Sequence, residues 1–149
     1  MTPLSAFLAL PGGDRSLLLS ALVTLAGVRL ALRVVPVDRL RRPVGRARLH
    51  ARPAERIAWA VQAASRRLPG TTCLASALAA QRLLARNGHD CQLTIGVARD
   101  GRGFAAHAWV VCDGVTLVGG EQSVDYTPLL AWSSDASARR PDSIVRDRS

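Results

Sequence analysis

Hydrophobic positions along the chain follow a helical spacing through the first half and a strand spacing after it. Residues 16–35 are almost continuously apolar and are followed by Pro36, so the pattern predicts a first helix that ends there. Apolar residues at helical spacing predict a second helix from Pro53 to Leu68. A third helix is predicted from Thr71-Thr72, which suit its N-terminal cap, to Asn87-Gly88.

After the third helix, apolar residues alternate with polar ones, as in half-buried strands. Strands are predicted from Cys91 to Val97, from Phe104 to Cys112 and from Val115 to Val118. Asp113-Gly114, between the last two strands, is typical of a two-residue hairpin turn. Helices followed by a small antiparallel sheet predict an α+β fold.

The composition fits one folded unit with three regions. The chain has 149 residues, 48% of them hydrophobic, which is enough to bury a core without cross-links. We expect an apolar, Arg-rich helical region over residues 1–52, of which 1–13 form a loose start. The core is expected over residues 53–132, and a polar tail over 133–149.

Positive charge is concentrated in one region of the chain. The net charge is +9, every basic side chain is an arginine, and eleven arginines against two acidic residues lie within residues 29–67. Such a surface attracts nucleic acid, anionic lipid or an acidic peptide, and it is also compatible with a simple solvated surface. Few aromatic residues are available for stacking, and no recognised nucleic-acid motif is present, so we expect no nucleic-acid partner.

The apolar stretch from Ser16 to Pro36 is nearly long enough to cross a bilayer. Arg29 and Arg33 lie in its second half, where a charge is costly at membrane depth. The pattern therefore favours a buried helix, or a helix at a membrane or partner surface, over a membrane span. We expect a cytoplasmic protein and leave membrane association open.

The chain has three cysteines, Cys73, Cys91 and Cys112, and none of them forms a CxxC pair. This pattern does not favour a disulfide framework, so a reducing cytosol is expected. Cys91 continues the apolar face of its strand and is expected in the core. A zinc site from Cys73, His107 and Cys112 is an alternative, although the three lack a recognised ligand spacing.

Cys73 and His107 are the candidate catalytic residues. Cys73 begins the third predicted helix, where free backbone N–H groups and the helix dipole favour a thiolate. His107 lies in the middle of a predicted strand, from which an imidazole can serve as acid and base. Either residue alone is more often structural, because isolated cysteines are commonly buried. Their combination makes nucleophilic catalysis as plausible as packing.

Three blocks of sequence support the catalytic interpretation: CLASALAAQRLLARNG from Cys73, LTIGV from Leu93 and AHAWV from Ala106. Their combination resembles the transglutaminase-like leader peptidases of lasso-peptide biosynthesis, over about residues 53–121. The apolar, Arg-rich N-terminal region is also similar to that family. The resemblance implies a transglutaminase/papain-like core, with Cys73 as nucleophile, His107 as acid and base, and no cofactor.

The resemblance also implies a set of partners. Such peptidases cut a ribosomally made precursor peptide, and a macrolactam synthetase then closes the ring with ATP. In split systems a separate leader-recognition protein holds the leader. This chain begins directly with its apolar helix, so we expect a stand-alone peptidase that needs the separate leader-recognition protein. We expect the first helix to dock one of these partners or the inner leaflet.

The third catalytic residue departs from the family's pattern, which is expected to supply an Asp after the histidine strand. If Asp113-Gly114 forms the hairpin turn, His107 faces Gly120, and no acidic residue shares its face. Glu121 reaches that face only if Gly119-Gly120 forms a bulge. We select Glu121, with Gln122 and Asp125 in reserve, because a neutral amide can also orient a catalytic imidazole.

Two further residues have open interpretations. Trp109 shares the His107 face of its strand, so it lies either in the core or in the wall of a cleft. Gly96 either allows a close backbone approach or marks a bulge.

Two other functions stay open beside peptide hydrolysis. With an amine in place of water as acceptor, the same residues give transamidation or acyl transfer. In a non-catalytic alternative, the Arg-rich region binds a peptide or a membrane, and Cys73 only packs.

Overall fold

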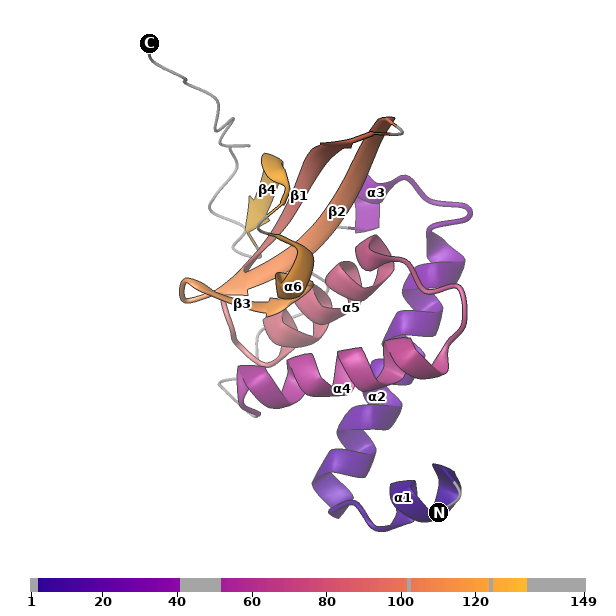
Figure 1. The fold of residues 1–149 in the computed structure, drawn as a ribbon. Coiled ribbons are helices and arrows are strands. Elements are labelled where there is room, and N and C mark those ends of the chain that lie inside the picture. The colour runs from indigo at the N-terminus through magenta and orange to yellow at the C-terminus, as the bar shows by residue number, and fades with distance from the viewer. Residues whose placement is uncertain (1–2, 41–51, 102, 124, 134–149) are drawn as a thin grey trace.

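The computed structural model describes residues 3–40, 52–101, 103–123 and 125–133. It confirms the predicted α+β fold, in which helices come first and an antiparallel sheet follows (Figure 1). The elements in chain order are α1 (Pro3–Leu8), α2 (Gly12–Ala31), α3 (Val37–Leu40), α4 (Ala54–Arg67), α5 (Cys73–Arg86), β1 (Cys91–Asp100), β2 (Gly103–Cys112), β3 (Val115–Val118), α6 (Gly120–Ser123) and β4 (Thr127–Ser133).

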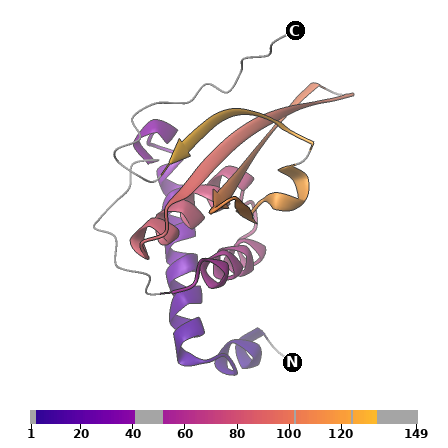
Figure 2. The ribbon, with the colours of Figure 1, turned by 90° about the vertical axis from the view of Figure 1, so that its left-hand side faces the viewer.

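The three longer helices pack on one side of the sheet (Figures 1 and 2). Helix α5 lies against β1 and β2, α4 contacts α5 and β3, and α2 packs on both α4 and α5. The core is aliphatic, because Leu, Val, Ile and Ala fill the space between these layers and aromatic residues are few. Leu25 on α2, Ile57 on α4 and Leu78 on α5 are fully buried in it. The predicted N-terminal region therefore contributes α2 to the same core as the rest of the domain.

The ends of α4 and α5 follow the residues that predicted them, whereas the first long helix ends at Ala31 and not at Val35, and a short helix, α3, follows Pro36. Pro53 precedes α4, and Thr72 caps α5 by accepting a 3.2 Å hydrogen bond from the Ala75 N–H at its Oγ1. The expected loose start over residues 1–13 is wrong for its described part, because residues 3–8 form α1 and α2 already begins at Gly12. The apolar residues Phe7 and Leu10 pack against the core and hold this segment. Of the predicted tail over 133–149, Ser133 belongs to β4 and not to the tail, and the rest lies outside the described residues, as do residues 41–51.

Helix α2 is apolar on more than its buried face. Leu19, Val23 and Leu30 are all more than half exposed. Arg29 lies beside Leu30 in the last turn of α2, and Arg33 follows the end of the helix. Within the described ranges, none of the helices combines the length and the apolar character that a membrane crossing requires. The expected docking role of this helix stays a prediction.

The sheet has the strand order β3-β2-β1-β4, with each neighbouring pair antiparallel. The predicted hairpin turn is confirmed: Cys112 pairs with Val115, and Asp113 and Gly114 both have positive φ. Strand β4 was not predicted. It contains Pro128, which lacks a ladder N–H, and it pairs with β1 at the edge of the sheet, where a proline is tolerated.

Both interpretations of Gly96, a bulge and a close approach to its backbone, fit the structure. The register of β1 against β4 shifts between Ile95 and Gly96, which is a bulge. A Cβ atom on Gly96 would lie 2.7 Å from the Trp109 indole and 2.8 Å from the Thr127 carbonyl oxygen. The missing side chain therefore makes room for Trp109 beside His107, which is the partner of Gly96 on β2.

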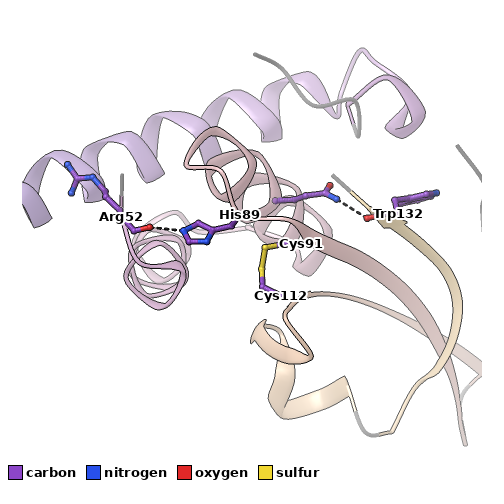
Figure 3. Close-up of a disulfide and its surroundings, with 6 residues drawn as sticks. Arg52, His89, Cys91, Cys112 and Trp132 are labelled. Carbon is purple, nitrogen blue, oxygen red and sulfur yellow. Dashed lines mark hydrogen bonds between the residues drawn. A yellow bond between two sulfur atoms is a disulfide. The ribbon is translucent and has the colours of Figure 1, made fainter. Parts of the chain in front are cut away.

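Cys91 and Cys112 form a disulfide between β1 and β2 (Figure 3), so the expectation of no disulfide is wrong. The two residues are directly opposite in the ladder, with Cα atoms 4.4 Å apart, and both are buried. Single-sequence spacing missed this pair because the two cysteines are 21 positions apart and meet only when the chain folds back as a hairpin. Because two of the three cysteines are joined, the cysteines give no support to a reducing compartment. Near the disulfide, His89 Nε2 is 2.7 Å from the Arg52 carbonyl oxygen, and Gln81 Nε2 donates to the Trp132 carbonyl oxygen.

Removing this disulfide is expected to lower the free energy of unfolding by about 3 kcal/mol, because the cross-link restricts the unfolded chain over this loop. The measurement is urea unfolding of the oxidised protein, the reduced protein and the Cys91→Ser/Cys112→Ser double variant. The double variant serves as control, since a reductant must leave its midpoint unchanged. An oxidised protein no more stable than the double variant would contradict the prediction.

Candidate active site

Cys73 is the first residue of α5 and the cysteine that the disulfide leaves free. Its side chain is half-buried. The first N–H groups of a helix have no acceptor within the helix. Thr72 takes the N–H of Ala75, which leaves those of Cys73 and Leu74 available beside the thiol. A free thiol with adjacent backbone donors provides both a nucleophile and a place for an oxyanion.

His107 lies in β2, opposite Gly96, and its side chain is 7% exposed. Its Nε2 is 2.8 Å from the carbonyl oxygen of Gly119. A carbonyl can only accept, so this contact requires the proton on Nε2. In the neutral imidazole, Nδ1 then carries the lone pair that a general base needs.

Two aromatic rings pack around the imidazole. The Trp109 ring is stacked on it at a centroid distance of 6.0 Å, and the Tyr126 ring is tilted against it at 5.1 Å. Trp109 is buried on the sheet face opposite the helices, where it packs on His107, and it lines neither of the two cavities described below. Tyr126 was missed by the sequence analysis, because it follows α6 in a loop with no pattern that points to His107.

Gly119 holds the acceptor for His107 in place. The register of β2 against β3 shifts between Val110 and Val111, and β3 ends one residue before Gly119, whose φ is +78°. A Cβ atom there would lie 3.1 Å from His107 Nε2 and 2.8 Å from the Ala108 carbonyl oxygen. The bulge at Gly119-Gly120 that Glu121 would need is not what the structure shows: the register shift lies earlier, and Gly119 forms the turn out of the strand.

Two adjoining cavities surround this turn. The cavity on the helix side has a volume of about 260 Å³ and is lined by Gln62, Ser65, Arg66, Cys73, Ser76, Ala108, Val118 and Gly119. The second has a volume of about 320 Å³ and is lined by Gln62, Arg66, His107, Gly119, Gly120 and Glu121. Gln62, Arg66 and Gly119 belong to both. Ala108 and His107 are consecutive on β2, so they face opposite sides of the sheet and open into different cavities.

Cys73 and His107 therefore line different cavities on either side of Gly119 and do not form a hydrogen-bonded pair. In the described part of the chain, the imidazole contacts Gly119, and the thiol makes no hydrogen bond. Direct proton transfer requires the imidazole to turn past Gly119 towards the thiol. Catalytic hydrogen bonds that are long or absent in a free enzyme often tighten when substrate binds.

The other candidate residues lie at different places around this site. Glu121 is exposed on α6 and lines the His107 cavity, while Gln122 follows it on the same helix. Asp125 is exposed in the loop before β4. The carbonyl of Gly119 occupies the position expected for the third residue, and the role of Glu121 stays a prediction. The alternative zinc site is wrong as conceived, because Cys112 is committed to the disulfide.

Gln62 and Arg66 were also missed by the sequence analysis. They lie four residues apart on α4, so they share one face of that helix. Their polar side chains were the available signal, since they interrupt the apolar pattern of α4, but the surface they face is set by the fold.

The Cys73 thiol at the start of α5 and the strand histidine His107 line two separate cavities that share Gln62, Arg66 and Gly119. Comparison with protein families matches residues 16–131 to the transglutaminase-like superfamily, and the chain belongs to that superfamily. Its members generally include cysteine peptidases and acyltransferases. No curated protein and no solved structure matches the chain.

Gly119→Ala is expected to displace the imidazole and to lower the free energy of unfolding by about 2 kcal/mol, through a strained φ and a steric clash. Gly114→Ala is the matched control, because Gly114 also has a φ of +78° but has open space around its Cβ position. Urea unfolding measures the loss of stability, and the NMR signals of the His107 ring report its hydrogen bond. Equal effects of the two substitutions on the His107 signals would contradict the expected contact.

Proposed function

We propose that this protein is a cysteine peptidase that removes the leader from a ribosomally made lasso-peptide precursor, with Cys73 as nucleophile and His107 as acid and base. The observation that supports it most is the free Cys73 thiol at the start of α5, beside the His107 cavity, in a transglutaminase-like domain. The substrate assignment rests on the sequence resemblance over the blocks around Cys73, Leu93 and His107.

The chemistry follows from the groups around the thiol. Nδ1 of His107 accepts the thiol proton, and the thiolate attacks the scissile carbonyl carbon. The N–H groups of Cys73 and Leu74 stabilise the oxyanion of the tetrahedral intermediate. Collapse of that intermediate breaks the C–N bond, and His107 returns its proton to the leaving amine. Water then hydrolyses the thioester by the same acid–base steps, which regenerates the thiol.

The proposal includes the expected partners. A separate leader-recognition protein brings the precursor to the peptidase, and a macrolactam synthetase uses the released core peptide with ATP. The proposed reaction requires the His107 imidazole to leave the Gly119 carbonyl and reach the Cys73 thiol once substrate is bound.

The test is a cleavage assay read by mass spectrometry. The purified chain is mixed with the precursor peptide encoded beside its own gene, with and without the neighbouring leader-binding protein. One cut at the leader–core junction, dependent on that protein, is the expected result. Added amines distinguish the alternative acyl transfer, because a product that carries the amine would replace hydrolysis as the assigned reaction.

A result with no cut under any condition would overturn the peptidase assignment. Salt-dependent binding that is identical in the wild type and in Cys73→Ala would then assign a binding module instead.

A further inference from the structure

Arg66 occupies a position that the catalytic scheme does not use. It lies in the last turn of α4, is exposed, and lines both the Cys73 cavity and the His107 cavity. In the described part of the chain, its guanidinium has neither a hydrogen-bond acceptor nor an ion-pair partner. The next residue differs: Arg67 donates to the Ala63 carbonyl oxygen at 2.9 Å and lines neither cavity.

The charges around the two cavities are not equal. Arg66 is the formally charged residue among those that line the Cys73 cavity, whereas the His107 cavity also contains the Glu121 carboxylate. The other residues beside Cys73 are small or neutral, such as Ser65, Ser76 and Ala108. The helix N-terminus at Cys73 adds a further partial positive charge. This cavity therefore favours a small anionic group next to the thiol.

We propose that Arg66 binds a carboxylate of the substrate beside the carbonyl that Cys73 attacks, and so selects substrates with an acidic group next to the scissile bond. The proposal deepens the proposed function, since it rests on Cys73 as the reactive group. A guanidinium offers paired N–H donors that match the two oxygens of a carboxylate. The cavity volume of about 260 Å³ accommodates one side chain or a chain end.

The test uses alkylation of Cys73 and does not require the natural substrate. Iodoacetate and iodoacetamide have nearly the same shape and react by the same displacement of iodide by the thiolate, but only iodoacetate carries a carboxylate. Both reaction rates are proportional to the fraction of Cys73 present as thiolate, so this fraction cancels in the ratio of the two rates. Because Cys91 and Cys112 form the disulfide, Cys73 is the thiol that reacts in the oxidised protein, and peptide mass spectrometry verifies this.

Arg66→Gln is expected to lower the iodoacetate-to-iodoacetamide rate ratio about fivefold, which corresponds to loss of one charge a few ångströms away in a water-like medium. Arg67→Gln is the matched control, because it removes the same charge from the adjacent position and is expected to leave the ratio within twofold. Added salt screens the charge of Arg66, so it should lower the iodoacetate-to-iodoacetamide rate ratio of the wild type towards that of Arg66→Gln. Equal ratios in the two variants, or no change in either, overturn the proposal.

Protection experiments then identify the source of the carboxylate. The probes are N-acetyl-glutamate α-amide, with a side-chain carboxylate, N-acetyl-glutamine, with a terminal carboxylate, and the neutral N-acetyl-glutaminamide. Each is tested for slowing the reaction of Cys73 with iodoacetamide. The acid that protects, in an Arg66-dependent manner, assigns a side chain or a chain end. If neither acid protects Cys73 better than the neutral amide does, Arg66 is not a carboxylate-binding residue. This conclusion holds whatever the cleavage assay shows.

Discussion

Cys73→Ala is expected to reduce turnover of the precursor by roughly 10⁴-fold or more, because the acyl-enzyme step depends on this sulfur. The effect on folding should be small. Cys73 is half-buried at the first position of α5, and the cap of that helix comes from Thr72. We expect a loss of stability of about 1 kcal/mol, because Cys73 packs against the core but is only partly buried and its side chain is small. Single-turnover cleavage and urea unfolding measure the two effects separately.

The matched control for this result is the Cys91→Ser/Cys112→Ser double variant. It removes two cysteines from the sheet and leaves the thiol on α5, so it should lose stability while its folded fraction keeps most of the activity. Cys73→Ser adds a second comparison, since it keeps a hydroxyl of similar size that is a weaker nucleophile. Substantial cleavage by both Cys73 variants would exclude the proposed covalent intermediate.

The parts of the fold that depend on neighbouring residues could be predicted from the sequence. Thr72 marks a helix start through its capping hydroxyl, and Asp113-Gly114 specifies its turn through two positive φ angles. The alternation from Cys91 onwards specifies a strand because a side-chain period of two is local. These signals also placed the candidate nucleophile and base on the correct elements.

The parts that were missed depend on contacts between distant residues. Predicting the disulfide requires knowing the register of β1 against β2. Predicting β4 requires knowing that one edge of β1 is free to pair with it. The acceptor for His107 is a backbone carbonyl, which any residue type supplies, so no side chain in the sequence can indicate it. Arg66 lines the cavities through the packing of α4 against β3. A single sequence records none of these long-range contacts.

Replacing His107 is expected to lower turnover of the precursor far more than replacing Glu121. His107→Ala is expected to lower turnover by roughly 10³-fold, because it removes the acid and base. Glu121→Gln is expected to lower it less than about tenfold, because the Nε2–H of His107 already has the Gly119 carbonyl as its acceptor. Asp125→Asn, in the nearby exposed loop, serves as the control for a loss of negative charge. The measurement is single-turnover cleavage of the precursor.

The comparison decides which group orients the imidazole. A carboxylate acceptor stabilises the imidazolium that forms during attack through its full charge, whereas a carbonyl does so through a dipole. A loss in Glu121→Gln as large as that in His107→Ala would mean that Glu121 replaces Gly119 as the partner once substrate is bound. A small loss would mean that the backbone turn at Gly119 completes the site. In that case the glycine and its positive φ, rather than an acidic side chain, are what the site requires at this position.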